Sequence, residues 1–230
     1  MTPLRRAELW GPSGVGKTSI MACASELRQE GRWWWNADEI DQKIAPAGPT
    51  DEAAIQDERV IFDGFTPAEL RDGCFEIVHR STMLPSQKIT ALQMLKSTCV
   101  QSMRYRALDL PEICLHDELL IHRSIALLAY STDFERDVVW YFQTVPVPDL
   151  VITVEADPQT IQARSLARAR RINTYYGQNP DRQLMRIKRC LEMMAIGKPV
   201  LKTRGVEIFE LDGTRPIEES AARLNKRLSP

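Results

Sequence analysis

The sequence predicts an α/β fold, a three-layer α/β/α sandwich around a central parallel sheet of about five strands. The first observation behind this prediction is that short apolar runs alternate with segments of helical periodicity, in the order of successive βαβ units. The second is the glycine-rich segment "GPSGVGK" at 11–17, which joins the first apolar run to the first helical segment. No internal repeat is visible, and 230 residues fit a single domain spanning 1–230.

Five apolar runs are the expected strands, at about residues 4–10, 32–36, 112–118, 149–156 and 206–211. In the first run, Arg5, Arg6 and Glu8 interrupt the apolar pattern of a buried parallel strand, so we expect its start at the margin of the sheet. In the second run, "RWWWN", neighbouring side chains face opposite sides, so Trp34 points away from the tryptophans beside it. We favour core packing for these rings, with stacking on a bound aromatic or sugar-like group as the alternative.

Segments of helical periodicity lie at about 18–30, 66–82, 87–106, 119–130, from 158 onward, and 216–228. The segment after residue 158 is rich in arginine and breaks near Gly177 and Pro180. Residues 45–58 are expected to form a loop with a short helix, and "RVIFDGF" at 59–65 a brief strand or turn. Asp63 precedes a glycine there, which indicates a turn residue, with a place in a binding site as the alternative.

Composition excludes several classes of protein. The hydrophobic share of 43% and the charged share of 27% are typical of a soluble globular protein, and no apolar run approaches the roughly 20 residues that cross a bilayer. The N-terminus lacks the apolar region of a signal peptide, so we expect a cytoplasmic protein without a membrane partner. Five scattered cysteines indicate reduced thiols, and three isolated histidines form no zinc pattern. A formal net charge of -1 argues against binding of a nucleic acid polymer.

The glycine-rich segment fits the phosphate-binding pattern G-x-x-x-x-G-K-[ST]. Its glycines let successive backbone N–H groups turn inward around a β-phosphate, and the following helix adds its positive N-terminal end. Lys17 is expected to reach the γ-phosphate of ATP, and the Thr18 hydroxyl to ligate Mg²⁺. The predicted nucleotide-binding residues of this loop are Gly11, Ser13, Gly14, Val15, Gly16, Lys17, Thr18 and Ser19.

A protein that binds a nucleoside triphosphate can be a switch, a hydrolase or a transferase. The sequence argues against the switch and leaves the other two open. A switch GTPase needs a guanine-reading N/T-K-x-D segment, but "NKRL" at 225–228 lacks the aspartate. A transport or motor ATPase often ends an apolar strand with Asp-Glu, and "ICLHDE", ending at Asp117 and Glu118, is an imperfect version. The same two acids also suit the start of the next helix as solvated residues, so the ATPase interpretation stays open.

Phosphoryl transfer to a small acceptor needs an acid beside the acceptor and extra positive charge on a segment that closes over the site. In "VITVEADPQTIQARSLARARR" a strand ends and a helix then presents Arg164, Arg168 and Arg171 on one face, at i, i+4 and i+7. Cations on one face repel each other unless an anion meets them. We therefore expect a lid over 164–185, with a solvated basic face as the alternative.

Four segments in this order resemble the P-loop nucleoside and nucleotide kinases, especially thymidylate kinase-like and shikimate kinase-like members. They are "GPSGVGKTSI", "CLHDELLIHRS", "VITVEADPQTIQAR" and "VEIFELDGTRPIEESAARL", and together they cover about half of the chain. The resemblance implies a P-loop fold with an arginine-bearing lid, whose Arg168 contacts the ATP phosphates. It also implies that Thr214, Arg215 and Pro216 in "DGTRP" line the adenine, and that Asp117 joins Thr18 in holding Mg²⁺.

The sequence also departs from these kinases. Thymidylate kinase-like proteins place Asp-Arg after the third strand, whereas here Asp117 is followed by Glu118 and the nearest arginine is Arg123. Shikimate kinase-like proteins place an acid after the second strand to hold the acceptor hydroxyls, and "WWWNADEI" offers Asp38 and Glu39 in a comparable place. A hydroxyl-bearing acceptor fits this pattern better than a monophosphate.

The sequence thus predicts a small-molecule kinase that uses ATP and Mg²⁺, with 40–110 as a helical acceptor-binding region and a homodimer as one compatible assembly. The predicted catalytic residues are Lys17, Asp38, Asp117, Glu118, Arg164, Arg168 and Arg171. The alternative is an ATPase or nucleotide-dependent regulatory module in which Glu118 activates water and residues 40–110 bind a protein partner.

Overall fold

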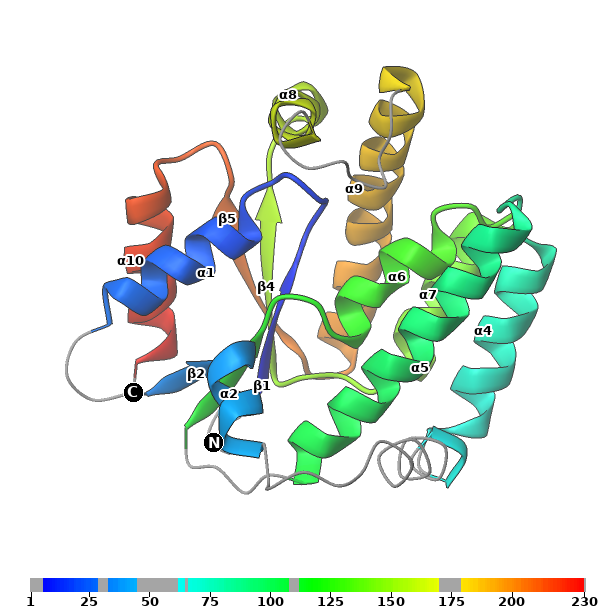
Figure 1. The fold of residues 1–230 in the computed structure, drawn as a ribbon, viewed down its shortest axis with the longest axis horizontal. Coiled ribbons are helices and arrows are strands. Elements are labelled where there is room, and N and C mark those ends of the chain that lie inside the picture. Colours follow the sequence, from blue (N-terminus) through cyan, green and yellow to red (C-terminus); the bar gives the residue numbers. More distant parts are fainter. Residues whose placement is uncertain are drawn as a thin grey trace.

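The computed structural model describes residues 6–28, 33–44, 62–64, 66–107, 112–169 and 179–229. Its sheet has five strands, β1 (Arg6–Trp10), β2 (Trp34–Asn36), β3 (Ile113–His116), β4 (Leu150–Glu155) and β5 (Glu207–Asp212). Their order is β2-β3-β1-β4-β5, and every pairing is parallel. The predicted α/β fold and its five strands are therefore confirmed (Figure 1).

Helices cover both faces of the sheet. The helices with printed bounds are α1 (Lys17–Glu26), α2 (Ala37–Ile44), α4 (Ala68–Arg80), α5 (Pro85–Ala107), α6 (Leu120–Leu128), α7 (Phe134–Thr144), α8 (Pro158–Ala169), α9 (Pro180–Thr203) and α10 (Ile217–Leu228). Residues 62–64 are helical, where the sequence predicted a brief strand or turn, and 45–58 lie outside the described residues. Among the described residues, no helix is long and apolar enough to span a bilayer.

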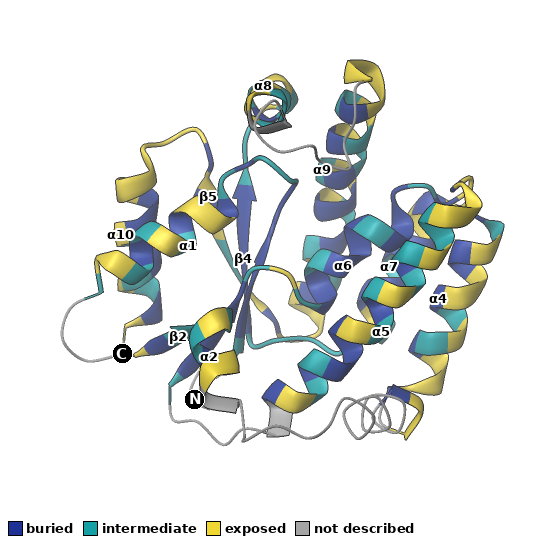
Figure 2. Ribbon diagram, viewed as in Figure 1, coloured by how far each residue is buried: buried dark blue, intermediate teal, exposed yellow. Residues whose placement is uncertain are grey.

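Side chains of the strands alternate between two hydrophobic clusters. Ala7 and Leu9 of β1 pack in one cluster with residues of α1 and α10, which lie side by side in Figure 1. Trp10 and Val151 belong to the other cluster, with residues of α4, α5, α6, α7 and α9. The inner strands β1, β3 and β4 are dark with burial in Figure 2, whereas the edge strand β5 is mostly exposed or half-buried. The centre of the sheet is thus enclosed, as a parallel sheet requires.

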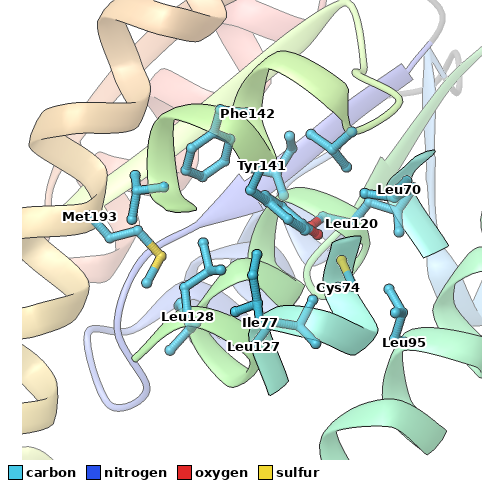
Figure 3. Packing of buried hydrophobic residues seen from close by; sticks show 14 of the residues in the cluster. Leu70, Cys74, Ile77, Leu95, Leu120, Leu127, Leu128, Tyr141, Phe142 and Met193 are labelled. Carbon is cyan, nitrogen blue, oxygen red and sulfur yellow. The ribbon is translucent and has the colours of Figure 1, made fainter. Parts of the chain in front are cut away.

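The larger cluster holds the helices in place beside the carboxyl ends of β1 and β3. Figure 3 shows Tyr141 and Phe142 of α7 among leucines of α6 and Met193 of α9. The Tyr141 hydroxyl donates a hydrogen bond of 2.6 Å to the backbone oxygen of Leu120, at the first residue of α6. Phe142 contacts the ring of Trp10 with centroids 4.9 Å apart. Packing therefore links α6 and α7 to the strand that leads into the glycine-rich loop.

The prediction that β1 begins at the margin of the sheet was wrong. β1 lies between β3 and β4, and the Glu8 side chain in it is buried, with 2% of the residue exposed. The two Glu8 carboxylate oxygens accept hydrogen bonds from the backbone N–H groups of Ile121 (3.1 Å) and His122 (2.7 Å), in the first turn of α6. The N-terminus of a helix favours negative charge, so α6 stabilises the buried Glu8 carboxylate. A central strand can therefore carry this acid, although its sequence pattern indicated a marginal position.

The three tryptophans at 33–35 lie in different environments. Trp34 is buried, and its indole N–H donates to Asn225 Oδ1 of α10 at 3.0 Å. The guanidinium of Arg28 lies 4.4 Å from the centre of the Trp34 ring. Trp33 is 52% exposed, and Trp35 packs against a small cluster with Ile40. Core packing is thus confirmed for Trp34, which ties the edge strand β2 to α10.

Candidate active site

The glycine-rich loop follows β1 and ends where α1 begins. Gly14 has φ +90°, and a Cβ atom there would lie 2.1 Å from Ser165 Oγ of α8. The Ser165 hydroxyl donates to the backbone oxygen of Ser13 at 3.0 Å. A side chain at position 14 would therefore be strained and would also displace α8 from the loop. The loop has the left-handed glycine and close helix contact of a phosphate-binding turn.

Lys17 lies inside this loop rather than in solvent. The residue is 6% exposed, and its ammonium donates to the backbone oxygens of Gly11 (2.8 Å) and Pro12 (3.2 Å). A buried ammonium held by carbonyl dipoles at a helix N-terminus is poised to meet an anion of a ligand. The residues present therefore fit a nucleotide phosphate at this place.

Thr18 contacts the carboxyl end of the neighbouring strand β3. Its hydroxyl donates to Asp117 Oδ2 at 3.3 Å, across 99 positions of sequence. A hydroxyl and a carboxylate are hard oxygen ligands of the kind that Mg²⁺ takes alongside phosphate oxygens. The fold thus brings the two predicted metal ligands together.

A cavity of about 330 Å³ opens over the loop. The predicted residues that line it are Ser13, Gly14, Val15, Gly16, Lys17, Thr18, Ser19, Glu118, Arg164 and Arg215. Thr214 and Pro216 do not line it, but Gly213 and Ile217 of the same turn do. The Thr214 hydroxyl and backbone N–H both bind Asp212 Oδ1, at 2.6 and 2.8 Å, which fixes the turn. The volume falls within the range of small-molecule sites.

Of the three arginines predicted to line the lid, Arg164 has a described side chain. Arg164 Nη1 donates to the backbone oxygens of Gly213 (2.6 Å) and Val15 (3.4 Å), so it joins α8 to the glycine-rich loop and to the 213–217 turn. The helix predicted after residue 158 is present as α8. Arg171 and the side chain of Arg168 lie outside the described residues, so their predicted contacts with phosphate stay predictions.

The acids after β2 do not reach the cavity in this structure. Asp38 is exposed in the first turn of α2 and is not among the residues that line the cavity. Glu39 forms an ion pair with Arg28 (Oε1 to Nη2, 2.5 Å) and accepts the backbone N–H of Asn36 at 2.9 Å. Asp63 is exposed in the short helical segment at 62–64. The acid that the structure does place in the cavity is Glu118.

Sequence reasoning missed polar groups on α6 and α9 behind the loop. His122 Nε2 lies 3.7 Å from Glu118 Oε1. Burial, then the charges of Lys17, Arg123 and Arg186, lower the pKa of His122 well below its usual value, so its imidazole is neutral near pH 7. Arg123, which is buried, donates to Thr98 Oγ1 of α5 at 2.9 Å. A histidine and an arginine buried in a helical layer have no signature in the periodicity of the sequence alone.

Comparison with known proteins identifies the fold. The structure is similar to that of a deoxyadenosine kinase from M. mycoides, solved with its products dCMP and a flexible dCDP bound, with a TM-score of 0.52 and 12% sequence identity. The match covers 97% of this chain and 98% of that chain. No protein-family model and no curated protein matches the sequence. The chain therefore has a P-loop kinase-like fold, confirming the family resemblance at the level of architecture.

Proposed function

We propose that this protein is a kinase that transfers the γ-phosphoryl group of ATP to a hydroxyl or phosphate oxygen of a small molecule, with nucleosides and nucleotides as the leading class of acceptor. The observation that carries the proposal is the 3.3 Å contact between Thr18 and Asp117, with Glu118 lining the same cavity. Groups suited to a phosphate donor and an acid suited to an acceptor thus meet at the carboxyl ends of two adjacent strands. The fold likeness to a deoxyadenosine kinase supports the choice of acceptor class.

Each described residue has a physical role in this proposal. MgATP, when bound, supplies the phosphoryl group and the metal charge that offsets its oxygens. Lys17 and the backbone amides of residues 14–18 hold the phosphates, and Thr18 with Asp117 holds the metal. Glu118 orients the acceptor hydroxyl and accepts its proton. Arg164 keeps α8 closed on the loop through its two carbonyl contacts.

The acceptor is proposed to lie on the side of the cavity where Glu118 lies, and the region 40–110 keeps its expected part in binding the acceptor as a proposal. Asp38, Arg168 and Arg171 keep their predicted catalytic roles as proposals. Arg168 and Arg171 would add positive charge around the transferring group, an effect worth on the order of a thousandfold in rate in related chemistry.

A second candidate is an ATPase that acts on a protein partner. The observation that favours it is the position of Glu118, which follows Asp117, the proposed metal ligand, and lines the cavity. A carboxylate there can orient a water molecule as well as an acceptor hydroxyl. Acceptor dependence separates the two functions.

The test measures ATP consumption by purified protein with and without a panel of nucleosides, deoxynucleosides, nucleotides and hydroxylated metabolites, with products identified by mass spectrometry. We expect at least one acceptor to raise ATP consumption tenfold or more and to gain one phosphoryl group. Lys17→Ala should abolish that product, which controls for contaminating kinases. Full-speed ATP hydrolysis without any acceptor, and no phosphorylated product, would establish the ATPase instead.

A further inference from the structure

The carboxylate of Glu118 has one close polar neighbour among the described residues, the imidazole of His122. Glu118 lies in the turn between β3 and α6 and lines the cavity over the glycine-rich loop. His122 lies one helical turn later, in α6, and its Nε2 atom is 3.7 Å from Glu118 Oε1. The side chain of Glu118 is 57% exposed and that of His122 only 12%. The contact thus joins an exposed acid in the cavity to a largely buried ring.

The first turn of α6 holds the His122 ring in a fixed place. The backbone N–H of His122 donates to Glu8 Oε1 in β1 at 2.7 Å, and that of Ile121 donates to Glu8 Oε2 at 3.1 Å. The Tyr141 hydroxyl of α7 donates to the backbone oxygen of Leu120 at 2.6 Å. This turn is therefore attached both to a central strand and to α7, so His122 lies on a rigid element of the kind that positions a reacting group.

Glu118 has no such support of its own. It precedes the first residue of α6, and its exposed side chain can rotate about several bonds. A group that orients a substrate must be held within about 0.5 Å of its working position, because a displacement of about 1 Å can cost roughly a hundredfold in rate. A carboxylate that is to orient an acceptor hydroxyl therefore needs a partner that fixes it, and His122 is the described residue within reach.

The surroundings of the imidazole indicate which nitrogen carries its proton. Burial lowers the pKa of His122 well below its usual value, so the ring is neutral near pH 7 and has a single N–H donor. The Nδ1 atom is buried without a hydrogen-bond partner among the described residues, whereas Nε2 faces the Glu118 carboxylate. A proton on Nδ1 would leave a buried N–H unpaired and would set two acceptors against each other. A proton on Nε2 avoids both costs.

The 3.7 Å separation is longer than a hydrogen bond, which spans about 2.7–3.2 Å. In a site without substrate such contacts are often long, and they tighten when substrate binds. Glu118 is the exposed partner, so a small rotation of its side chain closes the contact while α6 stays in place. The Nε2–H group then binds Oε1, and Oε2 is left to face the acceptor hydroxyl.

We propose that His122 is a positioning residue for Glu118, whose carboxylate it aims at the acceptor through a hydrogen bond from Nε2–H to Oε1. This role rests on the proposed function in that Glu118 is the group that orients the acceptor hydroxyl. A neutral donor suits the task, because a charged imidazolium would form an ion pair with Glu118 and make the carboxylate a weaker base. His122 acts through Glu118 and is not among the residues that line the cavity.

The first experiment measures the contact without turnover. The chain has three histidines, so nuclear magnetic resonance of protein labelled with ¹⁵N-histidine resolves His122, with His122→Gln used for the assignment. We expect the proton on Nε2 near pH 7, and we expect Glu118→Gln to shift the Nε2 resonance. A proton on Nδ1, or an Nε2 resonance that does not respond to Glu118→Gln, overturns the proposal.

The second experiment measures turnover with an acceptor found in the screen described above. We expect His122→Phe to lower kcat about tenfold and to change the KM for ATP less than twofold, because other residues hold the phosphates. His122→Gln places an amide N–H near the position of Nε2 and should recover most of the kcat. His122→Asn places it near the position of Nδ1 and should not. A purely structural role of the ring would not separate these two variants.

A double-mutant cycle tests whether His122 acts through Glu118. In the Glu118→Gln background, His122→Phe should lower kcat less than twofold further. The matched control is the ion pair of Arg189 and Glu192, which lie one turn apart on α9 (Nη1 to Oε2, 3.0 Å) and do not line the cavity over the glycine-rich loop. Arg189→Gln and Glu192→Gln, alone or together, should leave kcat unchanged. Thermal unfolding checks that each variant is folded.

The outcomes separate this role from the proposed function. The positioning role is wrong if His122→Phe leaves kcat unchanged, if the losses from His122→Phe and Glu118→Gln multiply in the double variant, or if His122→Gln and His122→Asn have equal kcat. A negative acceptor screen removes the kinase function alone, because the histidine resonances test the contact without turnover. The same cycle is then measured on ATP hydrolysis, in which Glu118 orients water.

Discussion

At the scale of single residues, Glu8 connects the glycine-rich loop with the acids of the candidate site. Its strand β1 leads into the loop, and its carboxylate binds the N–H groups at the start of α6, just after Asp117 and Glu118. Burial, opposed by hydrogen bonds from the α6 backbone and by the charge of Arg123, raises the pKa of Glu8 to about 7. Between about pH 4.5 and pH 7 the folded protein therefore holds a proton on Glu8 that the unfolded chain has already released, and above that range α6 stabilises the charged carboxylate.

Glu8 makes stability depend on pH in a defined direction. Because folding raises the pKa, the contribution of Glu8 to the free energy of unfolding is complete below about pH 4.5 and is lost as the pH rises through about 7. At about 1.4 kcal/mol per pKa unit, the loss is about 3 kcal/mol. We expect Glu8→Gln, which does not titrate, to remove this slope in urea unfolding measured from pH 5 to pH 8. An unchanged slope would mean that another group is responsible.

Asp117 is the residue on which the metal prediction depends. Asp117→Asn removes the negative charge beside the Thr18 hydroxyl, so the Mg²⁺ concentration for half-maximal binding of β,γ-imido-ATP, a non-hydrolysable analogue of ATP, should rise about tenfold. Glu76→Gln, at an exposed position of α4, serves as the control. Equal Mg²⁺ requirements in all three proteins would place the metal elsewhere.

The residues of the candidate site differ in how well the sequence predicts them. The glycine-rich loop was predictable because its residues are contiguous in the sequence, whereas the pairing of Thr18 with Asp117 was implied only by the resemblance to P-loop kinases. His122 was missed because it reaches Glu118 from the first turn of α6, where the sequence pattern predicts only a buried helix.

At the scale of elements, α9 packs closely against the core at one point. A Cβ atom on Gly197 would lie 2.5 Å from Phe142 Cε2 and 2.8 Å from Trp10 Cη2. Gly197→Ala should lower the free energy of unfolding by up to about 2 kcal/mol, because an overpacking cost of about 1–3 kcal/mol opposes the roughly 1 kcal/mol gained in helix propensity. Denaturant unfolding measures this difference.

A double-mutant cycle identifies the cause of that loss. Phe142→Leu makes room beside position 197, so the cost of Gly197→Ala should shrink in the Phe142→Leu background. Gly64→Ala is the matched control, because a Cβ atom there meets nothing within 4 Å. Additive effects of the two core substitutions would show that the contact is not responsible.

The elements themselves were largely predictable, since each strand is an apolar run bounded by turn residues. The prediction that β1 begins at the margin of the sheet failed for a physical reason. An acid within an apolar strand pattern indicates an exposed position, but the Glu8 carboxylate is stabilised by a helix that begins 112 residues later in the sequence, at Leu120. In the short helical segment at 62–64, Phe62 is buried in the larger hydrophobic cluster, a tertiary contact that the sequence pattern does not reveal.

At the scale of the whole molecule, nucleotide binding should stabilise the fold. A ligand at a hundred times its dissociation constant adds about 2.7 kcal/mol to the free energy of unfolding, which corresponds to a rise in Tm of about 5–10 °C for a chain of this size. We expect this shift with the magnesium complex of β,γ-imido-ATP in a thermal denaturation assay. Lys17→Ala should lose most of it, while Lys188→Ala, at an exposed position of α9, keeps it. A shift that survives Lys17→Ala would locate the nucleotide outside the loop.

The central position of β1 also governs when the protein can assemble during synthesis. β1 is the first described strand to leave the ribosome, yet its two neighbours are β3 and β4, whose residues 113–116 and 150–155 follow much later. Pairing over such separations is slow, because a long loop must close before any contact compensates for it. The glycine-rich loop, packed against Ser165 of α8, is therefore translated early but takes its final shape only after most of the chain has emerged.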